Sequence, residues 1–191
     1  KMCYLALTDS SIGESRSDYE IIITLDKENR TLTVSDNGIG MNQEDLETNL
    51  GTIAFSGSKQ FSEQMDESKS EEVDIIGQFG VGFYSAFMVA DKIEVVSKHY
   101  GEDQAYRWES DGAGGYSIEE AEREGHGTDV IMHIREDGEE ADEYSQYMRE
   151  YTMYKLIKKY SDYIRFPIKM LMPHPYVKEG SDPENPEYEE K

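Results

Sequence analysis

Apolar and polar positions along the chain follow the two periods that are typical of strands and of helices. Residues 20–25 form a β-branched run and residues 31–34 alternate between polar and apolar, with a turn at 27–30 between them. This pattern predicts a β-hairpin. Further strands are predicted at residues 92–98, 105–109, 128–134 and 164–170.

Helices are predicted between these strands. Asn42, with Asp45 three residues later, can cap a short helix that ends at Gly51. Residues 83–90 are apolar enough for a buried helix, and residues 144–156 carry a helical apolar face. Hairpins with separate helices, without regular strand–helix alternation, predict an α+β fold: a two-layer sandwich with helices on one face of a mostly antiparallel sheet.

The two ends of the chain differ from this middle part. Residues 1–7 are crowded with apolar side chains and no capping residue precedes them, which fits either a helix entered partway or a short buried helix. From Pro173 onward, prolines and acidic residues dominate, and such a segment cannot bury enough apolar surface to offset its ordering entropy. We therefore expect a folded domain at 1–172 and a disordered acidic linker at 173–191, leading to a further domain.

Charge and cysteine content narrow the functional classes. The chain has 19 Lys and Arg against 41 Asp and Glu, a formal net charge of −22. This charge repels phosphate backbones and anionic lipids, so we expect neither nucleic acid nor a membrane as partner. Cys3 allows no internal disulfide, and no apolar run approaches the ~18 residues of a membrane span, so we expect a cytoplasmic domain. The histidines show no metal-ligand spacing with Cys3, so no metal ligand is assigned.

The first candidate site is residues 36–41, directly after a predicted strand. Asp36 at a strand end can accept a hydrogen bond from an exocyclic amine. Glycines such as Gly40 let a flat ring approach the backbone, and Met41 offers it a polarizable face. A loop in which Asp36 caps its own turn explains the same residues, and short motifs often match by chance.

Two further glycine-containing segments are candidates. Residues 77–82 lead into the apolar stretch at Phe83, and backbone N–H groups at a helix N-terminus can hold an anion even where the overall charge opposes it. A flexible hinge explains these glycines equally well. Gly127 and Thr128 open a strand, where the Thr128 hydroxyl could bind a base directly or through water. The strand propensity of threonine explains Thr128 as well.

Taken together and in this order, residues 36–41, 49–57 and 76–87 closely resemble the ATP-binding domain of the ninety-kilodalton heat-shock chaperones. The bacterial, HtpG-like members are the nearest match, and the resemblance covers residues 1 to about 172. It implies the superfamily of gyrase, sensor histidine kinases and MutL, whose ATP domain is a two-layer sandwich. It also implies a cytoplasmic stress-response chaperone, an ATP-driven homodimeric clamp that acts on unfolded or partly folded client proteins.

The resemblance implies a role for each matching residue. Asp36 would accept from the adenine amino group with help from Thr128 and a water, Gly40 and Met41 would line the base, and Asn49 would lie near the ribose and phosphates. The phosphates of ATP or ADP would be held by backbone N–H groups of Gly80, Val81, Gly82 and Phe83. Residues 51–82 would form a lid that closes over the nucleotide.

Two departures from the family pattern bear on activity. The family's general-base Glu and Mg²⁺-ligand Asn lie on a helix that would run into residues 1–7 and is not in this sequence, so no catalytic residue is assigned. Phe55 stands where the family usually has Lys or Arg, a loss of ~1.5–3 kcal/mol, or roughly tenfold to a hundredfold in affinity. We expect a nucleotide-binding fragment that is inactive and binds weakly, and whether it is itself an enzyme stays open.

Two other functions remain open. The chain could be a non-catalytic interaction module in which residues 77–82 form a structural hinge. It could also be the ATP domain of a sensor histidine kinase or a gyrase-like protein. The latter would need a phosphoacceptor-histidine domain or a basic DNA-binding surface, and the sequence shows neither.

Overall fold

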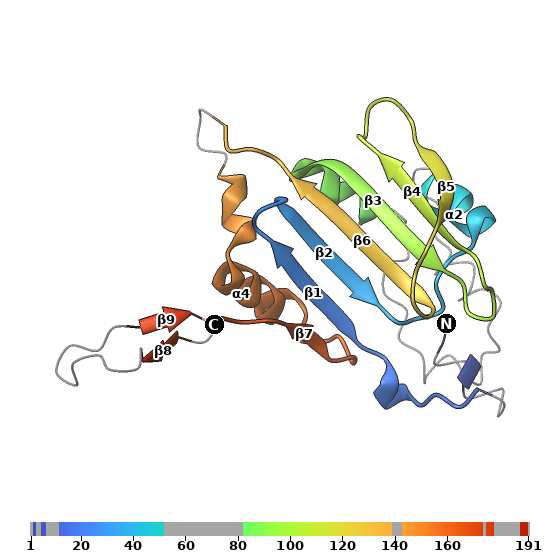
Figure 1. The fold of residues 1–191 in the computed structure, drawn as a ribbon, viewed down its shortest axis with the longest axis horizontal. Helices are drawn as coiled ribbons and strands as arrows, with labels where there is room; N and C mark the ends of the chain where they lie inside the picture. Colours follow the sequence, from blue (N-terminus) through green and yellow to red (C-terminus); the bar gives the residue numbers. More distant parts are fainter. Residues whose placement is uncertain are drawn as a thin grey trace.

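The computed structural model of the chain describes residues 2, 5–6, 12–51, 82–138, 143–173, 175–177 and 188–190. A seven-stranded sheet in the order β5-β4-β3-β6-β2-β1-β7 dominates them (Figure 1). Its strands are β1 (Ile21–Asp26), β2 (Thr31–Asp36), β3 (Ala90–Lys98), β4 (Ala105–Ser110), β5 (Ser117–Ala121), β6 (Gly127–Ile134) and β7 (Ile168–Met170). β7 pairs in parallel with β1, and the other neighbours are antiparallel. The predicted α+β fold with a mostly antiparallel sheet is confirmed.

The predicted hairpin and the predicted capped helix both form. β1 and β2 pair with Ile23 opposite Val34, which places both side chains on the same face. α2 (Gln43–Leu50) begins with a capping box in which Asn42 accepts from the Asp45 backbone N–H at 3.0 Å. Gly51 ends the helix by donating its N–H to the carbonyl of Glu47.

The helical segments cover one face of the sheet. They are α2, η3 (Phe83–Met88), η4 (Tyr144–Met148) and α4 (Glu150–Tyr160), whereas η1 (Arg16–Asp18) precedes β1. Leu46 and Leu50 of α2 pack with Ile93 and Trp108 of the sheet in the main core cluster. A second cluster joins Met148 of η4 to strand residues whose side chains share that face. Among the described helices none is long and apolar enough to cross a bilayer.

The opposite face of the sheet is polar. Glu94 lies at its centre, with its carboxylate 2.7 Å from Lys92 Nζ and 2.8 Å from His133 Nε2. Arg107 in the neighbouring strand pairs with both Glu94 and Glu119. An antiparallel sheet with one core face and one solvated face has this alternation.

The structure departs from the sequence predictions in four segments. The stretch predicted as a helix at 83–90 is a six-residue 3₁₀ segment that runs into β3, and the helical face at 144–156 is split at Arg149 into η4 and α4. The last predicted strand, 164–170, shortens to three residues. β5 was not predicted.

The expected disordered linker contains regular structure. β8 (Pro175–Val177) and β9 (Tyr188–Glu190) pair antiparallel in a two-stranded sheet of their own. Backbone pairing between two short segments leaves no periodic apolar signal in so acidic a sequence, so the pattern could not show it. At the other end, Met2, Leu5 and Ala6 are helical, and Met2 is buried against Tyr19. The division at residue 172 stays a prediction.

Candidate functional site

Asp36 lies at the end of β2, where this strand pairs with the beginning of β6. The register places Asp36 opposite Thr128, with both side chains on the helix-covered face. The backbone N–H of Gly38 donates to Asp36 Oδ1 at 2.8 Å. Burial raises the pKa of the Asp36 carboxyl above its ordinary value, while this hydrogen bond and the charge of Arg123 oppose the rise. The carboxylate is therefore a partly desolvated acceptor, suited to a neutral donor on a ligand.

Gly40 fits against the backbone of two other segments, and no larger residue would. Its φ is +67°, and a Cβ at this position would lie 1.9 Å from the carbonyl oxygen of Lys98 and 3.0 Å from that of Gly127. The loop after β2 therefore packs directly on the ends of β3 and β6. This close approach, and not freedom of movement, explains the glycine.

Hydrogen bonds through Ser97 join Met41 to Thr128. The backbone N–H of Met41 donates to Ser97 Oγ at 2.8 Å, and Ser97 donates to the carbonyl of Gly127 at 3.0 Å. Because a hydroxyl has one proton, the 2.8 Å contact between Ser97 and Thr128 has Thr128 as its donor. The lone pairs of Thr128 Oγ1 are then left to accept from a ligand or a water.

Asn49 lies on α2 beside the same loop. Its amide Nδ2 is 4.0 Å from the sulfur of Met41 and donates to the carbonyl of Asp45 at 2.7 Å. The structure thus brings Asp36, Met41 and Thr128 together with Asn49 at the border. Contact of Asn49 with a ribose or phosphate stays a prediction.

The predicted phosphate-binding segment is described only at its end. Gly80 and Val81 lie outside the described residues, as do Phe55 and the rest of the expected lid between Gly51 and Gly82. The Phe83 ring packs edge-on against Trp108 at 5.5 Å, so its side chain belongs to the core. Phosphate binding by the backbone N–H groups of Gly82 and Phe83 stays a prediction.

Three residues that the sequence analysis did not single out support this loop. Asn37 accepts from the Glu20 backbone N–H at 2.8 Å and donates to the Asp18 carbonyl at 2.7 Å. The ring of His126 donates to the carbonyl of Gly38, and Arg123 donates to the carbonyl of Asp36 at 2.8 Å. Arg123 and His126 shortly precede Gly127, so their position next to that motif was the available signal.

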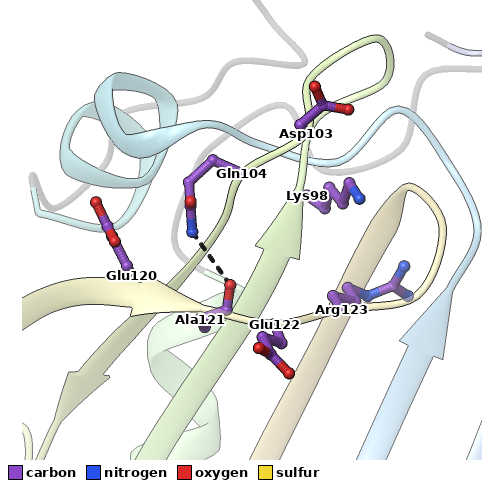
Figure 2. A pocket seen from close by; sticks show the side chains of 7 residues that line it. All are labelled: Lys98, Asp103, Gln104, Glu120, Ala121, Glu122 and Arg123. Atoms are coloured by element: carbon purple, nitrogen blue, oxygen red, sulfur yellow. Dashed lines mark hydrogen bonds between the residues drawn. The ribbon is translucent and has the colours of Figure 1, made fainter.

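A cavity of about 500 Å³ lies at the same end of the sheet but on its polar side (Figure 2). Lys98, Gln104 and Arg123 are among its lining residues, and Gln104 Nε2 donates to the carbonyl of Ala121 at 3.2 Å. None of the predicted nucleotide-site residues lines it. Within the described parts of the chain, no three His, Cys, Asp or Glu side chains are grouped as a metal site would need.

The sequence of the chain matches those of known proteins. A sequence profile of the family described as "Histidine kinase-, DNA gyrase B-, and HSP90-like ATPase" matches residues 12–128. The chain belongs to this family of ATPases. The same match supports the helix-backed, mostly antiparallel sheet as the family's fold.

Similar proteins within the family are bacterial and carry one name. The chain is 52% identical over 191 residues to "Chaperone protein HtpG" of Clostridium perfringens, which covers the whole chain and 30% of that relative. It is 52% identical over 170 residues to the protein of that name from Natranaerobius thermophilus, covering 89% of the chain and 27% of the relative. The Shouchella clausii protein is 49% identical over 191 residues. The chain thus spans less than a third of the length of these relatives.

Proposed function

We propose that this chain is the nucleotide-binding domain of an HtpG-like chaperone and that it binds the adenine of ATP or ADP at Asp36. The observation that carries the proposal is the position of the Asp36 carboxylate. It lies at a strand end on the helix-covered face, partly desolvated and opposite Thr128. An adenine amino group is a neutral donor of the kind that such an acceptor can bind without bringing a second charge into the site.

The surrounding residues would fix the plane of the base. Gly40 and Gly127 keep the loop after β2 against the sheet ends, so the Asp36 side chain and the backbone beyond it keep a constant spacing. Thr128 Oγ1 has lone pairs available for a ring-edge donor or a bridging water. The side chain of Met41, next to Asn49, would contact the base face.

The wider activity belongs to the proposal as well. We propose that the full-length protein uses ATP with Mg²⁺ to drive a homodimeric clamp on client proteins in the cytoplasm. The name shared by the similar proteins supports this, and it favours a chaperone over a sensor kinase or a gyrase-like protein within the same family. Weak binding and absent turnover by the isolated 191-residue chain stay predictions.

Calorimetric titration of the full-length protein with ADP tests the adenine site. Replacing Asp36 by Asn keeps the shape and the acceptor for Gly38 but can turn a donor toward the adenine amino group. We expect a loss of about 1–3 kcal/mol of ADP affinity. Asp91→Asn is the matched control, since Asp91 is an exposed carboxylate of the same sheet. Equal affinity in wild type and Asp36→Asn would favour the interaction-module interpretation.

A further inference from the structure

The guanidinium of Arg123 has an acceptor for each of its five N–H donors. Nε and Nη2 donate to the two carboxylate oxygens of Asp129, both at 3.0 Å, and Nη2 also donates to the carbonyl of Asp36 at 2.8 Å. Nη1 donates to the carbonyls of His126 at 2.7 Å and Gly125 at 3.1 Å. The side chain is only 11% exposed. Because the guanidinium is planar and all its donors are used, it fixes both the distances and the directions of the groups that accept from it.

These acceptors belong to segments that are far apart in the sequence. Arg123 and Asp36 are separated by 87 positions, and Asp129 lies in β6. In the register of the sheet, Asp129 is opposite Ser35 and Thr128 is opposite Asp36. Asp129 therefore holds the guanidinium on the polar side of the sheet, directly behind the point where β2 ends. Figure 2 shows the Arg123 side chain extending from the segment that follows β5.

We propose that Arg123 is a positioning residue for base recognition: by holding the main-chain carbonyl of Asp36 from behind, it sets the depth and direction of the carboxylate that accepts from the adenine amino group. The inference rests on the proposed adenine site. Hydrogen-bond recognition needs its acceptor within a few tenths of an ångström and a few tens of degrees of the productive geometry, which a supporting shell must supply.

The positive charge of Arg123 also supports Asp36 as an acceptor, because it favours the ionised form of the Asp36 carboxyl. Burial raises the pKa of the Asp36 carboxyl, while the backbone N–H groups of Gly38 and Thr128 and the guanidinium favour its ionised form. Asp129 opposes them as a neighbouring negative charge, and its pairing with Arg123 limits that effect. Removing the guanidinium would both release the Asp36 backbone and leave the negative charge of Asp129 near Asp36 without its cation.

The test compares two ligands that differ only at the group Asp36 would read. The full-length protein is titrated with ADP and with purine riboside 5′-diphosphate, which lacks the 6-amino group. We expect the wild type to prefer ADP by roughly tenfold to a hundredfold. In Arg123→Met this preference falls to about threefold or less, because the acceptor is no longer held in line with the donor. A general loss of stability would weaken both ligands and leave their ratio unchanged.

Arg107→Met is the matched control. It removes an arginine from the polar face of the same sheet, where Arg107 pairs with Glu94 and Glu119 and not with the loop after Asp36. We expect it to keep the wild-type ratio. Asp129→Asn tests the same role in a second way, because it keeps the Arg123 side chain but removes the anion that anchors its guanidinium. We expect a reduced ratio in this variant too.

The possible results distinguish the adenine site from the positioning role of Arg123. A wild type that binds both ligands equally, or neither, refutes the adenine site itself. A wild type that discriminates while Arg123→Met discriminates equally refutes the positioning role alone. If circular dichroism shows that Arg123→Met does not fold, Asp129→Asn decides, and an unchanged ratio in that variant overturns the inference.

Discussion

Gly127 offers a direct test of how closely the ends of β2 and β6 approach each other. Its φ is +121°, a region that residues with a Cβ rarely adopt. A Cβ at this position would lie 2.1 Å from the carbonyl oxygen of Asp36 and 2.8 Å from the Cα of Asn37. Both atoms are backbone, so a strand end has to move. Backbone strain of ~1–3 kcal/mol and overpacking of ~1–3 kcal/mol together predict that Gly127→Ala lowers the free energy of unfolding by about 2–6 kcal/mol.

Gly125→Ala measures the effect of backbone strain alone, without the steric clash expected in Gly127→Ala. Gly125 precedes β6 in the same loop and also has a positive φ, +67°, but no atom lies within 4 Å of its added Cβ. Only conformational strain of about 1–2 kcal/mol is expected there. Urea unfolding of both variants, followed by circular dichroism, gives the two free energies. Equal destabilisation of the two variants would refute the reasoning, because it would mean that the clash of the added Cβ with the Asp36 backbone does not lower the free energy of unfolding.

Three further predictions follow from the same contacts. Asp36→Asn should stabilise the fold although it weakens ADP binding: since burial raises the pKa of Asp36, the native state holds this proton more tightly than the unfolded chain. The contribution of Asp36 to the free energy of unfolding therefore falls as pH rises above 3.8, the ordinary pKa of an aspartate. The difference in free energy of unfolding between Asp36→Asn and wild type, measured with urea, should grow as the pH is raised from this value. Ser97→Ala leaves the Met41 N–H without its acceptor and should cost about 1–3 kcal/mol in the same assay. Asn42→Ala removes the cap of α2 and should cost about 1 kcal/mol, seen as a lower melting temperature.

Strands that carry apolar residues on the core face could be predicted from the sequence, and the mostly polar edge strand β5 could not. From Ile93 onward, β3 alternates between buried and partly exposed positions, which is the signal that the period detects. β5 contributes Ile118 opposite Trp108, but its other residues are polar or small, as is common on edge strands. The parallel pairing of β7 with β1 joins residues that the chain separates widely, so no local pattern could indicate it.

The same distinction applies to the site. Asp36, Gly40 and Met41 are neighbours in sequence, so a short motif could show them, and Thr128 followed a glycine at a strand start. The role of Ser97 could not be predicted, because a serine at the end of a strand is part of no recognisable motif. Only the register of β3 against β6 brings it to Thr128. Arg123 was missed for the same reason: its partners come from β2 and β6, and its neighbours in sequence are mostly glutamates.

The features at the end of β2 are difficult to explain by stability alone. A partly buried carboxylate opposes folding, and Gly40 and Gly127 give up conformational freedom that an ordinary hairpin end would not require. Ser97 and Arg123 then supply partly buried hydrogen bonds whose common effect is to hold this unfavourable arrangement in one geometry. Strain that the surrounding structure fixes so firmly is typical of a binding site. The loss of stability caused by burying the Asp36 carboxylate is explained if the carboxylate serves as the hydrogen-bond acceptor for a bound ligand.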